Sequence, residues 1–120
     1  MDIETFREYC LAVKGATEST PFIDRNVLVF KVMGKMFCMM SLEPKDGVYW
    51  ADLKCNPEYT IELREKHQEI GPPHIKTALM WHRIVLDSDV PDKLIVELIN
   101  HSAREVIKKL PKKKQAEYNR

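Results

Sequence analysis

The 120-residue sequence contains little cysteine and little glycine. Its three cysteines, Cys10, Cys38 and Cys55, are odd in number and show no Cys-x-x-Cys spacing. This pattern argues against a disulfide framework and against a zinc site. The four glycines include no pair in Gly-x-Gly spacing, so the sequence contains no glycine-rich loop for binding a phosphate.

Long hydrophobic runs and a targeting segment are also absent. No stretch approaches the roughly 18 apolar residues that a membrane span requires. The chain starts Met-Asp-Ile-Glu-Thr-Phe, which is acidic, whereas a secretory signal starts with basic residues and continues with an apolar run. Together with the cysteine content, these absences predict a soluble cytoplasmic protein with no membrane partner.

Patterns of catalysis and metal binding are missing as well. The four histidines are spread over different predicted elements, and His74 and His82 are eight positions apart rather than in a His-x-x-x-His pattern. Cys55 precedes a predicted helix, whose N-terminus favours a thiolate, but nucleophilic catalysis also requires a base beside the sulfur. An enzyme that uses Cys55 or His74 is therefore the least favoured hypothesis, and we expect no metal and no cofactor.

The overall composition is typical of one globular domain. Hydrophobic residues make up 44% of the chain and charged residues 31%, and a chain of this length buries roughly two-thirds of its unfolded surface. We predict a single compact α+β domain over residues 1–111, followed by a basic C-terminal tail over residues 112–120.

Three helices are predicted. Apolar side chains that recur at spacings of three and four indicate the first and the last, and the start Asn56-Pro57-Glu58 indicates the second. They cover approximately residues 2–15, 56–68 and 91–111, and Asp2 and Asn56 are good N-caps for the first two. The last helix has the longest apolar stripe, made of Leu94, Ile95, Leu98, Ile99, Ser102, Val106 and Leu110.

Four strands are predicted over residues 27–33, 36–42, 48–54 and 81–86, which are rich in β-branched and aromatic side chains. Short turns join the first three, so these strands must form an antiparallel meander. The segment 74–80 fits neither a helix nor a strand clearly. The expected architecture is a two-layer α+β fold in which three helices pack on this antiparallel meander.

Several short motifs follow one another in a fixed order along nearly the whole chain. They are Pro21-Phe22, Gly34-Lys35-Met36-Phe37, Leu53-Lys54-Cys55-Asn56-Pro57-Glu58, Gly71-Pro72 ahead of His74, Lys76 and Trp81, Val90-Pro91-Asp92, His101-Ser102, and Leu110-Pro111-Lys112-Lys113. In this order they resemble the MmcQ/YjbR family. The resemblance implies helices on an antiparallel sheet, and it implies the DNA-binding role usually attached to that family.

The chain departs from the family pattern at two places. Members often read Gly-Tyr-His-Met in the central loop, where this sequence has Gly71-Pro72-Pro73-His74-Ile75. Members also often have Ser-Tyr in the last helix, where Ala103 follows Ser102 here.

The first candidate site for nucleic acid consists of basic and aromatic residues in or beside these motifs. Lysine and arginine bind phosphates, and tryptophan offers a surface on which a base stacks. The alternative is a tryptophan that covers the core and is surrounded by solvated lysines. The candidate residues are Lys35, Lys54, His74, Lys76, Trp81 and Arg83.

The second candidate site is the basic C-terminal end. Residues 104–120 contain seven basic and two acidic side chains and so carry +5, which leaves −4 for the rest of a chain whose net charge is +1. Such asymmetry favours an anionic partner, although a solvated terminus is the plainer explanation. The candidate residues are Lys108, Lys109, Lys112, Lys113 and Lys114.

A third feature is a group of methionines near the predicted sheet, which is typical of core filling but also of adaptable binding grooves. The group comprises Met33, Met36, Met39, Met40 and Met80. The favoured hypothesis is a monomeric DNA-binding domain that contacts phosphates without catalysis. The alternative is a domain that binds a protein or a small ligand.

Overall fold

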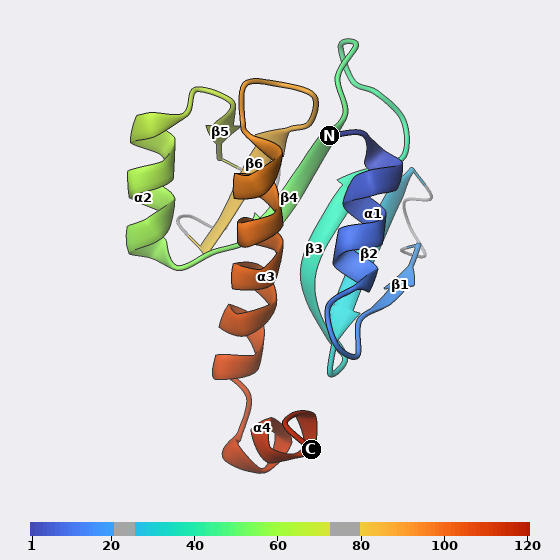
Figure 1. The fold of residues 1–120 in the computed structure, drawn as a ribbon, viewed down its shortest axis with the longest axis vertical. Coiled ribbons are helices and arrows are strands. Elements are labelled where there is room, and N and C mark those ends of the chain that lie inside the picture. Colours follow the sequence, from blue (N-terminus) through green and yellow to red (C-terminus); the bar gives the residue numbers. More distant parts are fainter. Residues whose placement is uncertain (21–25, 73–79) are drawn as a thin grey trace.

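The computed structural model of the chain describes residues 1–20, 26–72 and 80–120 (Figure 1). Within these ranges the chain forms four helices and six strands. In chain order they are α1 (Ile3–Leu11), β1 (Thr17–Ser19), β2 (Val27–Val32), β3 (Lys35–Ser41), β4 (Trp50–Lys54), α2 (Pro57–Lys66), β5 (Ile70–Gly71), β6 (Trp81–Val85), α3 (Asp92–Lys108) and α4 (Lys112–Tyr118).

The strands form one antiparallel sheet in the order β1-β2-β3-β4-β6-β5. The first four strands are neighbours in both sequence and space, so the predicted meander is confirmed. After β4 the chain leaves the sheet to form α2, and β6 then pairs with β4 while the two-residue β5 lies at the edge. The predicted α+β class is confirmed, with one helix and two short strands more than the sequence indicated.

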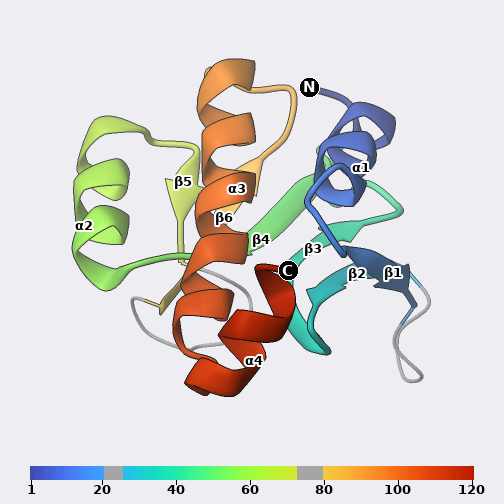
Figure 2. The ribbon, with the colours of Figure 1, turned by 60° about the horizontal axis from the view of Figure 1, so that its bottom comes forward.

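Helices α1, α2 and α3 lie along one face of the sheet, with α3 in the middle (Figure 2). The core lies between these two layers. Phe6 of α1 meets Phe30 of β2 edge-to-face, with ring centroids 6.4 Å apart. Leu53 of β4 and Leu98 and Ile99 of α3 are fully buried. The apolar stripe predicted for the last helix therefore does face the sheet.

The predicted caps are present at the starts of α1 and α2. The Asp2 carboxylate accepts a hydrogen bond from the Thr5 backbone N–H at 2.7 Å. The Asn56 side-chain oxygen accepts from the N–H groups of Glu58 and Tyr59 at 2.9 and 3.3 Å. Each cap satisfies donors that the first helical turn leaves without partners.

The turn between β2 and β3 lies one residue earlier than predicted. Met33 and Gly34 have φ angles of 51° and 78°, the pattern of a tight two-residue turn that matches the twist of the strands. Lys35 is therefore not in the turn but is the first residue of β3. This register fixes Lys35 at one end of the sheet.

Helix α4 forms within the segment that the sequence suggested was a tail. Its position relative to the N-terminal part is set by Lys14 and Tyr118. The Tyr118 hydroxyl donates to the Lys14 carbonyl at 2.7 Å, and the Lys14 ammonium donates to the Tyr118 carbonyl at 2.6 Å. At the junction, the Gln115 side chain donates to the Leu110 carbonyl at 2.8 Å and so satisfies a group near the end of α3. The basic C-terminal end is thus an ordered extension below α3 (Figure 1).

Candidate nucleic-acid interface

A cavity of about 280 Å³ lies where the start of β3, the end of β4 and the end of α3 meet. Three of its lining residues are lysines and the other three are apolar. The residues that line it are Lys35, Met36, Lys54, Val106, Lys109 and Leu110. The cavity therefore combines a concentration of positive charge with an apolar wall.

Each lysine reaches this cavity from a different element. Lys35 is the first residue of β3, directly after the Met33-Gly34 turn, and Lys54 is the last residue of β4. Lys109 is the residue that ends α3. The lysines converge because the register of β3 and β4 and the length of α3 bring these three positions to one end of the fold.

The charge in the cavity is poorly compensated. Burial lowers the pKa of Lys54, and the positive charge of Lys109 lowers it further, while the carboxylate of Glu105 acts in the opposite direction. Among the described residues, no carboxylate forms a salt bridge with Lys35, Lys54 or Lys109; Glu105 pairs instead with Lys108, at 3.9 Å. Two lysines close enough for one to lower the pKa of the other, with no carboxylate paired to either in the described part of the chain, form a positively charged site that a bound anion would stabilise.

Trp81 does not line the cavity, but it contacts Lys54, which does. The two residues are directly opposite each other on β6 and β4. The Lys54 ammonium lies 6.0 Å from the centre of the Trp81 ring, which is a cation–π contact. Trp81 is half-buried, so part of its indole remains accessible to solvent.

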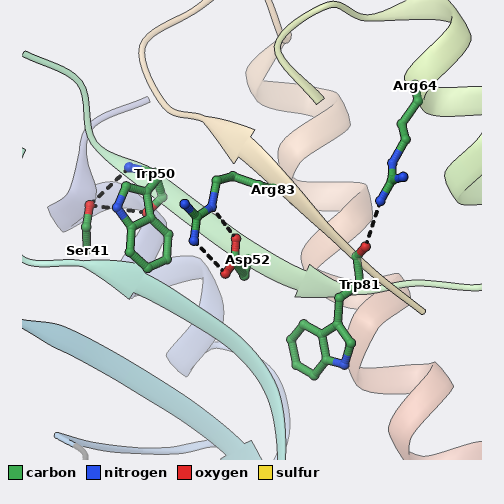
Figure 3. A network of polar contacts seen from close by, with 6 residues as sticks. All are labelled: Ser41, Trp50, Asp52, Arg64, Trp81 and Arg83. Carbon is green, nitrogen blue, oxygen red and sulfur yellow. Dashed lines mark hydrogen bonds and ion pairs between the residues drawn. The ribbon is translucent and has the colours of Figure 1, made fainter. Parts of the chain in front are cut away.

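Arg83, which the sequence grouped with Trp81, is already engaged by other residues (Figure 3). Its guanidinium donates two hydrogen bonds to the Asp52 carboxylate, at 2.7 and 2.9 Å. It also lies over the Trp50 ring, 3.8 Å from the ring centre. The charge of Arg83 is thus neutralised within the protein, and the side chain braces β6 against β4.

The lysines of the C-terminal end differ in whether a carboxylate lies within salt-bridge distance. Lys112 and Lys113 are exposed, and neither has a salt-bridge partner among the described residues. Lys114 lies 3.7 Å from Glu117, one turn along α4. Since α4 is held by Tyr118, these lysines extend the positive surface from a defined position.

His74 and Lys76 lie outside the described residues, so the structure does not place them. Of the remaining candidates, the structure joins two groups that the sequence treated as separate. Lys35 and Lys54 belonged to the first candidate site and Lys109 to the second, yet all three line the same cavity. The length of α3 could have predicted that Lys109 joins the other two lysines. Its 17 residues span about 25 Å, which returns the chain to the end of the sheet where β3 starts.

A buried polar cluster lies between α2 and β6. The Arg64 guanidinium donates to the Trp81 carbonyl at 3.1 Å (Figure 3), while its Nε has no partner within residues 1–20, 26–72 and 80–120. His82 is fully buried, and neither ring nitrogen is hydrogen-bonded to any residue that the structure describes. Burial, and secondarily the charges of Arg64 and His101, lower the pKa of His82 to about 4. This histidine is neutral at physiological pH.

Cys55 does not have the environment of a reactive thiol. Its side chain is buried, and burial raises its pKa above the ordinary value. The neutral thiol is therefore favoured, which supports a structural role.

Across residues 1–20, 26–72 and 80–120, no three His, Cys, Asp or Glu side chains come together as potential metal ligands. In the same ranges, the helices are too short or too polar to cross a membrane.

Comparison with known sequences identifies the family. The sequence model of the YjbR family matches residues 11–104. The chain belongs to the YjbR family. It is 29% identical over 116 residues to the protein YjbR of Escherichia coli strain K12, covering 96% of this chain and 95% of that protein. The YjbR protein of Escherichia coli O157:H7 matches equally well.

Solved structures show the same fold. A Deinococcus radiodurans protein with a DUF419 domain superposes with a TM-score of 0.86 at 32% identity, over 98% of this chain and 87% of that one. A Pseudomonas syringae protein superposes with a TM-score of 0.75 at 22% identity, over 88% of this chain and 98% of that one. The match to the family model ends at residue 104, so Lys109 and the lysines of α4 lie beyond it.

Proposed function

We propose that this protein binds DNA through lysine–phosphate contacts, without catalysis. The observation that carries the proposal is the convergence of Lys35, Lys54 and Lys109 on one cavity, with no carboxylate paired to any of them among the described residues. Lysines in this state release counterions when a phosphate replaces the ions around them, which favours binding.

The surroundings of the cavity support the same function. Lys112 and Lys113, exposed on α4, continue the basic surface beyond Lys109, so a nucleic-acid backbone can follow it. Trp81 adds an aromatic surface next to Lys54, suited to contact with a base. Arg83 has no direct role in this proposal because Asp52 already neutralises its charge.

The binding is proposed to tolerate many sequences. The exposed face of α3 near the cavity carries Arg104 and Lys108. Asn100, one turn earlier, uses its side-chain amide to donate to the Val96 carbonyl at 3.0 Å, so the described part of this face offers no row of free Asn, Gln and Arg for reading bases. Phosphate contacts determine position and affinity but carry no sequence information.

The cellular setting is part of the proposal. All three cysteines, Cys10, Cys38 and Cys55, are free and buried. Free thiols fit a reducing compartment, which supports the proposed cytoplasmic location, where the protein has access to DNA.

The direct test is a fluorescence-anisotropy titration with a labelled mixed-sequence DNA duplex at low and moderate salt. Three proteins besides the wild type are compared: K112A/K113A/K114A, K35A/K109A and the matched control K45A/K93A. Lys45 and Lys93 are exposed and lie far from the cavity, in the β3–β4 connection and at the start of α3.

We expect salt-sensitive binding that the first two variants weaken and the control retains. The slope of log K against log salt should become shallower by about 0.9 for every phosphate that a variant no longer neutralises. The DNA proposal fails if the wild type shows no binding at tens of micromolar in low salt.

The cavity also gives specific support to the alternative of a small-ligand site. Its volume of about 280 Å³ is near the lower end of ligand pockets, which begin at roughly 300 Å³. A small anion that protects the protein against thermal unfolding, without any DNA binding, would favour this alternative.

A further inference from the structure

We infer that the three-lysine cavity formed by Lys35, Lys54 and Lys109 binds a phosphate monoester, the group found at a phosphorylated strand end or on a free mononucleotide. The inference deepens the proposed function and rests on it for the nucleic-acid ligand. The inference concerns the kind of phosphate that enters the cavity, a terminal monoester. DNA binding in general requires only contacts with the diester phosphates along the backbone.

The first argument is charge balance. The three lysines contribute +3, and Glu105, whose field reaches Lys54, contributes −1. Because Glu105 is shared with Lys108 at 3.9 Å, the cavity carries between +2 and +3. A monoester carries about −1.5 to −2 at neutral pH, since its second pKa is about 6. A diester within a strand carries −1 and would leave the lysines only partly neutralised.

The second argument is the arrangement of donors. Each ammonium has three donors and no acceptor, and the three lysines come from three directions, namely the ends of β3, β4 and α3. A monoester presents three terminal oxygens, one for each lysine. A diester presents only two such oxygens, because its other two continue the chain.

The third argument is the shape and lining of the cavity. Its volume of about 280 Å³ is larger than a phosphate alone requires, and Met36, Val106 and Leu110 form an apolar wall beside the lysines. A sugar or base attached to the phosphate can lie against this wall. Trp81, in contact with Lys54, is placed to stack on a base that protrudes from the cavity.

Unpaired bases stack on the accessible part of an indole more readily than paired ones. The ligand that uses the lysines, the apolar wall and the indole together is therefore a single-stranded end bearing a phosphate. A mononucleotide offers the same group without the strand.

The test is an anisotropy titration with labelled single strands of about 12 nucleotides, a length within the usual range of single-strand sites. The two strands of the first pair are identical except that one has a hydroxyl and the other a phosphate at the 5′ end, and both carry the label at the 3′ end. In the second pair the hydroxyl or phosphate is at the 3′ end and the label is at the 5′ end. Adenosine monophosphate and adenosine are tested as competitors. The proteins are the wild type, K35A/K109A and the control K45A/K93A.

We expect an end phosphate to increase affinity about tenfold, equivalent to about 1.4 kcal/mol. K35A/K109A should abolish this difference and K45A/K93A should keep it. Adenosine monophosphate should compete, and adenosine should not. Lys35 and Lys109 are exposed, so both variants should remain folded, which thermal unfolding checks.

The outcomes separate the inference from the proposed function. Equal binding of phosphorylated and hydroxyl ends overturns the inference and leaves DNA binding in place. An end-phosphate effect that survives in K35A/K109A also overturns it, because the phosphate then binds elsewhere. Binding of adenosine monophosphate that requires the two lysines, without binding of any strand, supports the monoester site and removes the DNA function.

Discussion

Arg83 and Asp52 face each other across neighbouring strands and form a two-pronged ion pair, with donor–acceptor distances of 2.7 and 2.9 Å. The Asp52 side chain is 3% exposed and that of Arg83 is 18% exposed. This pair connects β4 to β6, the two strands that position Lys54 and Trp81 at the candidate interface.

Asp52→Ala should destabilise the fold by about 3 kcal/mol, because it leaves a largely buried guanidinium without its counter-charge. Urea unfolding measures the loss. The double variant D52A/R83A should lose less than the sum of the two single variants, since the unpaired charge is then absent. If D52A lowers the free energy of unfolding by less than about 1 kcal/mol, solvent compensates the charge of Arg83 and the ion pair does not stabilise the contact between β4 and β6.

Protonation of His82 should make stability depend on pH. The pKa of His82 is about 4 in the folded protein and about 6.5 in an unfolded chain. Between these values the unfolded state binds the proton and the folded state does not. Stability is therefore complete above pH 6.5 and declines as the pH falls toward 4, by roughly 3 kcal/mol in all.

Other groups titrate in the same window, including His101, whose pKa is also lowered by burial. The informative quantity is thus the difference between the wild type and H82L, followed by urea unfolding from pH 7 to pH 4. The wild type should lose stability faster than H82L on acidification. Parallel curves would mean that His82 is protonated or solvated in the folded state.

Ile99→Ala should cost about 2–5 kcal/mol, because Ile99 is fully buried at the centre of the helix–sheet interface and the substitution leaves a cavity. The matched control on the same helix is Lys93→Ala, at an exposed position, which should change stability by no more than about 0.5 kcal/mol. Thermal or urea unfolding measures both. A loss below roughly half a kcal/mol for I99A would place the core face of α3 elsewhere.

Tyr118→Phe should loosen α4. The substitution removes the hydroxyl that donates to the Lys14 carbonyl at 2.7 Å, a hydrogen bond worth about 1 kcal/mol. Hydrogen exchange should show faster exchange of the α4 amides and unchanged protection in β3 and β4. Tyr9→Phe is the control, because Tyr9 is exposed and makes no hydrogen bond among the described residues. If the α4 amides exchange at the same rate in Y118F as in the wild type, other contacts hold this helix in place.

Local chemistry explains why much of the fold was predictable. The caps Asp2 and Asn56 act on donors within their own first turn, so sequence alone identifies them. The apolar stripe of α3 likewise depends only on the helical period. The α+β class and the meander follow from these patterns and from the short turns between strands.

Short elements and turn registers were less predictable. The β2–β3 turn differs by one residue because Met33 adopts a positive φ angle, which its side chain does not favour intrinsically. Strands β1 and β5 comprise three and two residues and exist because a neighbouring strand supplies their hydrogen bonds. Helix α4 depends on Lys14, which is far from it in the chain.

The sequence by itself determined the longer helices and strands, their apolar faces and the segments where basic residues are numerous, because these properties depend on neighbours along the chain. Only the tertiary structure decided which basic residues share a site. It paired Arg83 with Asp52 through strand register, and it brought Lys109 to Lys35 and Lys54 by packing α3 across the sheet. Such meetings depend on the docking of distant elements, which no local pattern encodes.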